Sequence, residues 1–179
     1  MNNSITIKPI STEGELWHAE KLYLGSFPLS ERRETRDWIE YTWNKAGFHN
    51  NVIMHGENIV GFISYWEFPD FVYVEHFAMN KDIRGRGLGG RALDRLLRNY
   101  NMSKPIILEV EMPTDEISKR RIEFYSRHGF SLRPEQYFQP PYRKGDEPVE
   151  MKIMVHTLKP ASFSFAPTIS TLKKEVYGV

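Results

Sequence analysis

Seven residues with four glycines and two arginines form the chemically most specific stretch of the chain. They read Arg84-Gly85-Arg86-Gly87-Leu88-Gly89-Gly90, after a strand-like segment, residues 72–79, and at the start of a helical pattern, residues 88–100. The first N–H groups of a helix have no partner within the helix, and the helix dipole is positive there. Glycines let the backbone approach a bulky anion, and arginines add charge-assisted hydrogen bonds. The stretch therefore predicts a site for a phosphate or pyrophosphate.

Two other phosphate-binding motifs fit this stretch less well. The phosphate loop of nucleotide triphosphatases ends in Gly-Lys-Ser/Thr, and that ending is missing here. The glycines also satisfy the letters of the dinucleotide pattern G-x-G-x-x-G, with Glu109 or Glu111 as a later acidic residue. In that motif the first glycine follows its strand directly, whereas residues 80–84 intervene here. We therefore set both interpretations aside.

With its flanking strand and helix, the stretch resembles the acyl-CoA motif of the GNAT superfamily of N-acyltransferases. That motif reads Arg/Gln-x-x-Gly-x-Gly/Ala and matches residues 84–89. Residues 124–130, FYSRHGF, are similar to a second family pattern, Phe/Leu-Tyr-x-x-x-Gly-Phe. The chain departs from the family at Ser118 and Arg121, where many members have Asn and Ala, which puts a contact from Ser118 to CoA in doubt. The resemblance covers roughly residues 5–157.

The resemblance implies an enzyme that moves an acetyl group from acetyl-CoA, its co-substrate, directly to a primary amine in a ternary complex. It implies that the loop amides hold the CoA pyrophosphate, that the preceding strand binds the pantetheine arm, and that Tyr125 protonates the CoA sulfur. A backbone N–H near Phe77 or Met79 would stabilise the oxyanion. The cofactor-binding residues expected on this basis are Phe77, Ala78, Met79, Arg84, Gly85, Arg86, Gly87, Leu88, Gly89 and Gly90.

Three glutamates are candidates for the base that removes a proton from the amine. Glu75 comes first, because it stands in an otherwise apolar strand where desolvation would raise the pKa of its carboxyl group. Glu109 and Glu111 are its rivals. They are two apart and so share one face of a strand, and Glu109 lies deeper in the apolar run. An ion pair with a neighbouring Arg or Lys, or simple exposure at a strand end, is the non-catalytic interpretation of these residues.

Strict alternation along residues 71–79 predicts two faces for the central strand. It places Phe71, Tyr73, Glu75, Phe77 and Met79 on one face and Val72, Val74, His76 and Ala78 on the other. On this interpretation His76 and Glu75 cannot easily reach one site, and His76 is a packing residue. None of the six histidines forms a cluster with metal-ligand spacing, so we expect no metal site.

Apolar periodicity and turn residues predict the remaining elements. We expect strands near residues 5–9, 51–54, 59–66, 105–111 and 149–155, and helices near residues 12–27, 30–46 and 117–127, with an aromatic, proline-rich loop at residues 136–142. With the resemblance, they predict an α+β fold: a mixed, mostly antiparallel sheet of six to seven strands with helices on both faces. Residues 1–157 would form the acetyltransferase domain, and residues 158–179 a C-terminal extension whose packing stays open.

Composition excludes several other classes. The chain has 179 residues and a net charge of +1, which suggests one domain and no general attraction to nucleic acid or membranes. It has no cysteine, so disulfides, cysteine nucleophiles and thiolate metal sites are excluded. The N-terminus lacks the pattern of a signal peptide, and no apolar run reaches membrane-spanning length. We expect a cytoplasmic protein.

The acceptor pocket is expected between the first two helices and the loop at residues 136–142. Its candidate residues are polar or aromatic: Glu31, Arg32, Glu111, Tyr137 and Tyr142. They favour an amine acceptor, a small molecule or a peptide, while neither nucleic acid nor a membrane is expected as a partner and a homodimer stays open. Two other functions remain as alternatives: a non-catalytic acyl-CoA-binding or regulatory module, and a nucleic-acid binder that uses the arginines of residues 84–98.

Overall fold

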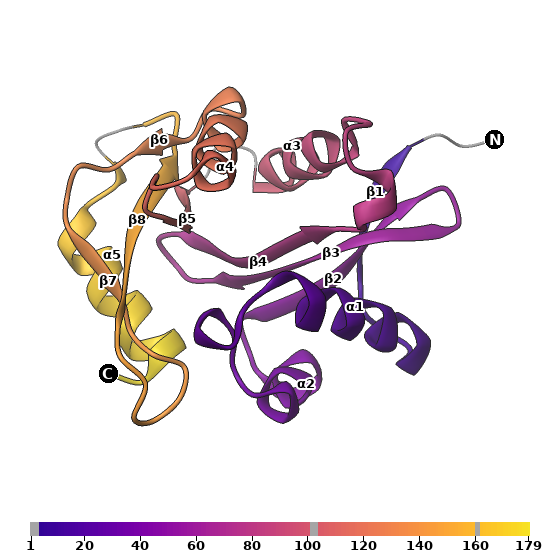
Figure 1. Ribbon diagram of the computed structural model, residues 1–179, viewed down its shortest axis with the longest axis horizontal. Helices are drawn as coiled ribbons and strands as arrows, with labels where there is room; N and C mark the ends of the chain where they lie inside the picture. The colour runs from indigo at the N-terminus through magenta and orange to yellow at the C-terminus, as the bar shows by residue number, and fades with distance from the viewer. Residues whose placement is uncertain (1–3, 101–103, 160–161) are drawn as a thin grey trace.

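A mixed β-sheet forms the centre of the protein, and helices cover both of its faces (Figure 1). The computed structural model describes residues 4–100, 104–159 and 162–179. In chain order the elements are β1 (Ile5–Pro9), α1 (Glu13–Ser26), η1 (Leu29–Glu31), α2 (Thr35–Asn44), β2 (Phe48–His55), β3 (Asn58–Glu67), β4 (Val72–Met79), η2 (Lys81–Ile83), α3 (Leu88–Tyr100), β5 (Ile106–Glu111), α4 (Glu116–Arg127), β6 (Ser131–Leu132), β7 (Tyr137–Gln139), β8 (Val149–His156), α5 (Phe165–Leu172) and η4 (Lys173–Tyr177).

The sheet confirms the predicted fold class. Among the described residues it has eight strands in the order β1-β2-β3-β4-β5-β8-β6, and β7 pairs with β8 outside this path. Only β4 and β5 are parallel, and every other pair is antiparallel. The additional strands β6 and β7 are two and three residues long, and β7 occupies part of the segment that we expected to be a loop.

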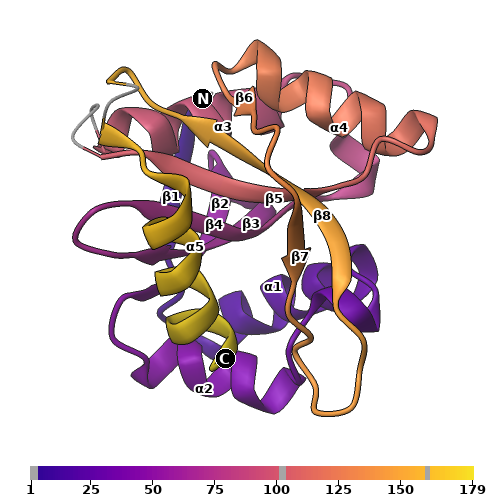
Figure 2. The same cartoon turned by 90° about the vertical axis from the view of Figure 1, so that its left-hand side faces the viewer.

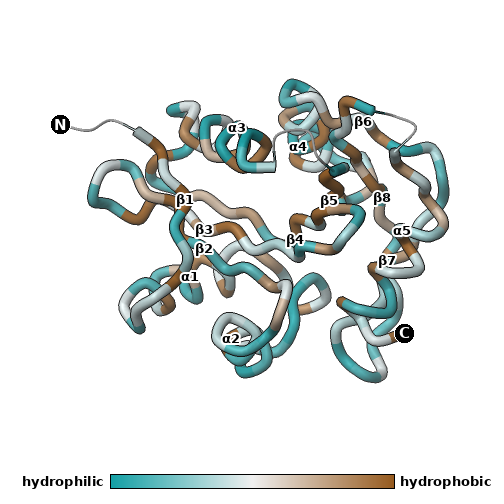
Figure 3. The backbone as a smooth tube through the Cα atoms, turned by 180° about the vertical axis from the view of Figure 1, so that it is seen from behind, coloured by the Kyte–Doolittle hydropathy of each residue, from teal (hydrophilic) through white to brown (hydrophobic). Residues whose placement is uncertain are grey.

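Two apolar layers hold the helices on the sheet. The helices α3 and α4 cover one face, and α1 and α2 cover the other (Figure 1). In α3 the buried residues recur at helical spacing, Leu88, Ala92, Leu93 and Leu96, and each large one contributes about 1.5–3 kcal/mol by burial. Hydrophobic residues gather along the central strands, whereas hydrophilic ones dominate the outer turns of the helices (Figure 3).

The first two helices differ from expectation in detail. A capping box between Thr12 and Glu15 starts α1 as predicted. Trp17, however, was expected in its apolar stripe and is 57% exposed. The second helix, expected from residue 30, begins only at Thr35, because Leu29–Glu31 form a separate 3₁₀ turn and Arg32 is extended.

A β-bulge interrupts β4. Ser64 of β3 lies opposite His76, but the next residue, Tyr65, lies opposite Val74, so Glu75 is an extra residue in β4. An extra residue moves all later side chains to the opposite face. Strict alternation was therefore wrong: Phe77 and Met79 lie with Val72 and Val74 on the α3 face, while Tyr73 and Ala78 belong to the core on the α1 face.

The strands β4 and β5 diverge after three paired residues. Val72, Tyr73 and Val74 pair with β5, and residues 75–79 have no partner on that side. On its other side β4 stays paired with β3 as far as Met79. The second half of β4 therefore presents backbone N–H and C=O groups toward β5 that no described strand pairs with.

The C-terminal segment, residues 162–179, packs on the sheet of its own chain. Figures 1 and 2 show α5 beside β7 and β8. Ile169, Leu172 and Val176 are buried in the core on the α1 face, and the π-helical turn η4 ends at Gly178, whose φ is +75°. No helix in the described ranges has the length and apolar character needed to cross a membrane.

Candidate active site

A cleft of about 900 Å³ opens where β4 and β5 diverge. The glycine-rich loop and the start of α3 line it on one side, and α4, η1 and the end of α1 line it elsewhere. Of the ten residues expected to bind the cofactor, all except Arg86 line the cleft, and so do the three expected catalytic residues, Glu75, Glu109 and Tyr125. The divergence of two strands thus brings together residues from four separate parts of the chain.

The loop of residues 85–90 has the geometry of an anion site. Gly85 and Gly87 have φ of +79° and +71°, and a side chain at either would point into open space. In the described part of the chain, none of the backbone N–H groups of residues 85–90 donates a loop, cap or side-chain hydrogen bond. Arg84 reaches back across the loop and donates from Nε to the carbonyl oxygen of Met79 at 3.3 Å. Free amides at a helix start fit a pyrophosphate.

Gly90 lines the cleft and also allows close packing of two helices. A Cβ atom there would lie 2.8 Å from Nε2 of His128, which follows α4. Nδ1 of the same ring lies 2.7 Å from Oδ1 of Asp94 on α3. The missing side chain thus allows α3 and the end of α4 to come into contact.

Tyr125 lies on α4 at the cleft. Its side chain is buried, and burial raises the pKa of its hydroxyl to about 12, so it keeps its proton at neutral pH. Within the described ranges its hydroxyl makes no hydrogen bond. Ser118, at the other end of α4, instead forms a capping box with Asp115. Tyr125 therefore offers a proton that nothing else in the described structure uses.

Glu75 is locked in a buried ion pair. The Arg33 guanidinium bonds to its carboxylate, and Trp66 Nε1 and the Tyr142 hydroxyl donate to it at 3.0 Å each. Burial alone would raise the pKa of this carboxyl, but Arg33 and the hydrogen bonds outweigh burial and lower it. Our expectation of a raised pKa was therefore wrong, and the structure has the ion pair that we kept as the non-catalytic alternative, with a partner 42 positions away.

His76 lies on the same face as Glu75, contrary to expectation. The bulge brings Nδ1 of His76 to 4.0 Å from Oε2 of Glu75. Its Nε2 lies 3.0 Å from the carbonyl oxygen of Glu31, and the rings of Tyr23 and Phe27 pack against it. Burial lowers the pKa of His76, so the ring is neutral at pH 7. Its contacts remain those of a packing residue.

Glu109 receives four neutral donors. Tyr73 and Tyr177 donate to its Oε2 at 2.8 Å each, and the Tyr137 hydroxyl and Gln139 Nε2 also bond to it. These hydrogen bonds favour the charged form, yet burial outweighs them and raises the pKa of Glu109. Within the described chain Glu109 forms no ion pair with Lys, Arg or His.

The expected acceptor residues divide into three groups. Glu31 and Glu111 line the cleft, and Glu111 pairs with Arg121. Burial raises the pKa of Glu31, and the negative charge of Glu111 adds to this effect. Arg32 does not line the cleft but bonds to the carbonyl oxygen of Phe27 at 3.2 Å. The other two, Tyr137 and Tyr142, bind the buried carboxylates Glu109 and Glu75.

Sequence reasoning missed several polar residues at the site. Arg33, Tyr73, Gln139 and Tyr177 all bond to a candidate carboxylate. The sequence did contain a signal for the bulge. Glu75 and His76 are two polar residues in succession, and strict alternation would place one of them in the apolar layer on each face of the sheet. For the other residues the contacts join distant positions, and no local pattern marks them.

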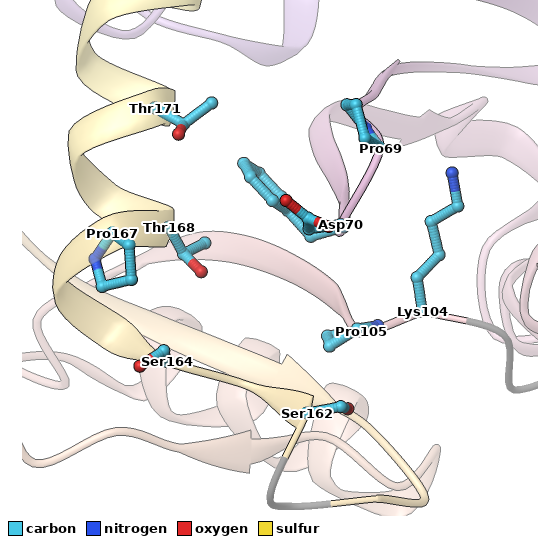
Figure 4. Close-up of a pocket in the computed structure, with 10 residues that line it drawn as sticks. Pro69, Asp70, Lys104, Pro105, Ser162, Ser164, Pro167, Thr168 and Thr171 are labelled. Carbon is cyan, nitrogen blue, oxygen red and sulfur yellow. The ribbon is translucent and has the colours of Figure 1, made fainter.

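A second cavity of about 390 Å³ lies between α5 and the turn before β4 (Figure 4). Prolines, serines and threonines line it, with Asp70 and Lys104 on the side opposite α5. Lys104 Nζ already bonds to Glu67 at 3.0 Å and to the carbonyl oxygen of Phe68 at 2.8 Å. None of the expected site residues lines this cavity. Among the residues placed by the structure, no group of three or more His, Asp and Glu could hold a metal ion.

Comparison of sequences gives a family match. The sequence model of the acetyltransferase (GNAT) family matches residues 15–130. The Bacillus subtilis protein YjbC, itself a candidate acetyltransferase, is 42% identical over 67 residues, which are 36% of this chain and 33% of that protein. The match thus spans about a third of the length of this curated relative.

Solved structures extend the similarity to nearly the whole chain. A candidate acetyltransferase of the GNAT family from Bacteroides thetaiotaomicron is 43% identical, with a TM-score of 0.89 over 97% of this chain and 99% of that one. A GNAT-family acetyltransferase from Elizabethkingia anophelis, solved with acetyl-CoA bound, has a TM-score of 0.60 at 16% identity over 88% of this chain and 100% of that one. At that identity the likeness concerns the fold alone.

Proposed function

Because the chain belongs to the GNAT family of acetyltransferases, we propose that it transfers an acetyl group from acetyl-CoA directly to a primary amine. One observation carries this proposal: the glycine-rich loop, Tyr125 and Glu109 line the same cleft. Direct acyl transfer needs a held thioester, a group that accepts a proton from the amine and a group that protonates the leaving sulfur. The cleft offers a residue for each task.

The loop and the free edge of β4 would hold acetyl-CoA, which supplies the thioester. The free N–H groups of residues 85–90 suit its pyrophosphate, and the positive φ of Gly85 and Gly87 turns the backbone around such a group. Residues 75–79 would hydrogen-bond the pantetheine arm, because this part of β4 has no strand partner on the cleft side. Arg84 and Arg127 also line the cleft and would balance phosphate charge.

Glu109 is the better candidate for the base. Its raised pKa brings it toward the working range of a general base, and no cation in the described chain pairs with it. Glu75 has a lowered pKa and a side chain with no exposed area, and its ion pair with Arg33 would have to open before it could accept a proton. We therefore assign the proton transfer to Glu109 and a structural role to Glu75.

The two proton carriers would act in sequence. Glu109 accepts the proton that the amine loses as its nitrogen bonds to the acetyl carbon. Tyr125 donates its proton to sulfur as the carbon–sulfur bond breaks, and regains one from solvent. Its pKa of about 12 keeps it protonated until the thiolate, a strong base when desolvated, needs the proton.

The acceptor should be cationic before it reacts. Four carboxylates line the cleft, those of Glu31, Glu75, Glu109 and Glu111. Glu75 pairs with Arg33 and Glu111 with Arg121, whereas Glu31 and Glu109 form no ion pair among the described residues. The two carboxylates without an ion-pair partner, Glu31 and Glu109, would attract an ammonium group and repel a carboxylate. A small amine and a peptide amine both meet this condition.

Thermal stability with acetyl-CoA is the first test. A ligand at about a hundred times its dissociation constant should stabilise the protein by roughly 2.7 kcal/mol. Gly87→Asp should abolish the shift, because its φ of +71° disfavours a side chain and a carboxylate repels pyrophosphate. Gly14→Asp is the matched control, since Gly14 has open space in the first turn of α1. Equal shifts in both variants would overturn the loop assignment.

Thiol release with a panel of amines tests the reaction itself. We expect release that depends on the amine and fails in Glu109→Gln. A thermal shift without release from any amine in the panel would instead support a non-catalytic acyl-CoA-binding module.

A further inference from the structure

The last turn of the chain contributes a side chain to the candidate site. Tyr177 lies in η4, far beyond residues 15–130 that match the family. Its hydroxyl donates to Oε2 of Glu109 at 2.8 Å and lies 3.1 Å from the hydroxyl of Tyr73. It also accepts from Nε2 of Gln139 at 3.2 Å. One residue of the C-terminal segment therefore touches three members of the cluster.

The directions of these hydrogen bonds follow from the ionised carboxylate. A carboxylate only accepts, so Tyr73 and Tyr177 both use their protons on Glu109. The Tyr177 oxygen is then free to accept, and it does so from the Gln139 amide nitrogen. This fixes which way the Gln139 amide faces.

The fixed amide leaves one buried acceptor without a partner. Gln139 is 4% exposed and lines the cleft, and its Oε1 has no hydrogen-bond partner in the described structure. An unpartnered buried oxygen is costly unless a ligand satisfies it. It lies on the same side chain whose Nε2 bonds to Glu109. A carbonyl oxygen and a carboxylate together form a suitable receptor for an ammonium group.

The position of Tyr177 is built into the fold. Ile169, Leu172 and Val176 anchor the segment in the core, and the N–H of Val179 closes the turn on the carbonyl oxygen of Lys173 at 3.2 Å. A π-helical turn is rare, and single turns of this kind are frequent at functional sites.

We propose that Tyr177 is a positioning residue of the acceptor site, which keeps the Glu109 carboxylate ionised and turns Gln139 so that its free oxygen receives the acceptor ammonium group. The inference rests on the function proposed above and deepens it. It makes the C-terminal segment part of the acceptor site rather than an accessory to the fold.

The groups that face Glu109 come from six elements or loops. Four side chains donate hydrogen bonds to it: Tyr73 of β4, Tyr137 and Gln139 of β7, and Tyr177 of η4. Glu31 of η1 and Glu111 of β5 line the same cleft. Tyr142, in the loop after β7, lies nearby and donates to the neighbouring carboxylate of Glu75. The direct contacts are all neutral donors. The charged side chains that line the cleft near them include the carboxylates of Glu31, Glu75 and Glu111 and the guanidinium of Arg121, which bonds to Glu111. Because each donor stabilises the ionised form of Glu109, loss of one donor should raise the proton affinity of the Glu109 carboxylate.

Tyr177→Phe tests the proposal. It removes one hydrogen bond to a charged group, so the acid limb of the kcat/KM profile against pH should move upward by about one unit, and the KM for the amine should rise. The acetyl-CoA thermal shift should stay unchanged. Tyr65→Phe is the matched control: it removes a buried hydroxyl from the core on the α3 face, away from the cleft, and should leave the limb in place. A limb that does not move in Tyr177→Phe would overturn the proposal.

A second measurement separates this inference from the proposed function. The ¹³C NMR titration of the Glu109 carboxyl, assigned by its loss in Glu109→Gln, reports proton affinity without turnover. An upward shift in Tyr177→Phe supports the positioning role even if the wild type acetylates no amine in the panel, a result that would sink only the proposed function. An unchanged titration in an active enzyme would overturn the positioning role alone.

Discussion

Two glutamates on neighbouring strands show how a partner decides the chemistry of a buried acid. Glu75 of β4 and Glu109 of β5 both lie near the point where the strands part, and both accept several hydrogen bonds. Burial by itself would raise the pKa of each carboxyl group. Beside Glu75 a full positive charge, Arg33, reverses that effect; beside Glu109 four neutral donors do not.

On the proposed function, this difference separates a structural acid, Glu75, from a reactive one, Glu109. Arg33 also stacks over aromatic rings, with its guanidinium carbon 4.7 Å from the ring centre of Tyr41 and 5.1 Å from that of Tyr142. This region is thus an ion pair enclosed in an aromatic cage. The Glu109 region keeps an acid whose charge is not neutralised, which is the condition that a base needs.

Glu109→Gln should have the largest effect on turnover. Loss of a general base lowers the rate by about 10²- to 10⁴-fold, and the fold should persist because the amide can still accept from the tyrosines. Steady-state thiol release measures the change, with Glu150→Gln on the exposed side of β8 as control. Wild-type turnover in Glu109→Gln would transfer the role of base to another group.

Glu75→Gln should have the largest effect on stability. It leaves the Arg33 charge buried without a counter-ion, and breaking such a pair costs about 3–5 kcal/mol. Urea unfolding should show a clear loss for Glu75→Gln and a smaller change for Glu109→Gln. The double variant Arg33→Met/Glu75→Gln should recover part of the loss. Equal losses in the two single variants would break the comparison.

The chain shows which of these features local sequence can reveal. The glycine-rich loop and the helix of Tyr125 were predicted because each is contiguous, so spacing and resemblance identify it. The confirmed fold class follows in the same way from periodicity. The bonds that distinguish the two glutamates span 42 positions for Arg33–Glu75 and 68 for Glu109–Tyr177, and no local pattern encodes them. The bulge was missed because a strand with one extra residue still alternates on either side of it.

Tyr125→Phe should lower turnover by about 10²-fold and leave the acetyl-CoA thermal shift intact, because the ring still packs and only the proton is lost. The loss of turnover in this variant can be compared directly with the loss in Glu109→Gln, which removes the other proposed proton carrier. Thiol release at saturating acetyl-CoA measures the change. Unchanged turnover would remove Tyr125 from the mechanism.

The pH dependence of stability should sharpen the comparison, with the smallest effects. The folded state lowers the pKa of Glu75, so this residue stabilises the fold above the ordinary glutamate range, about pH 4.3, and the contribution disappears as pH falls. The folded state raises the pKa of Glu109, so its contribution is present at low pH and lost as pH rises.

Difference curves of unfolding free energy isolate these two contributions. Relative to the wild type, Glu75→Gln should become less stable as pH rises from 3 to 7. Glu109→Gln should become relatively more stable over the same range. Parallel curves would show that the two carboxyl groups titrate alike.

The unpaired half of β4 also bears on whether the protein aggregates. An open strand edge is a template on which strands of other molecules can add, and proteins usually cover such edges. Here residues 75–79 leave an edge open within the sheet, in a cleft wide enough for a ligand. A bound co-substrate that pairs with this edge would occupy the place where a strand of another molecule could add. Saturation of the cleft with co-substrate would therefore reduce aggregation of the protein as well as prepare it for turnover.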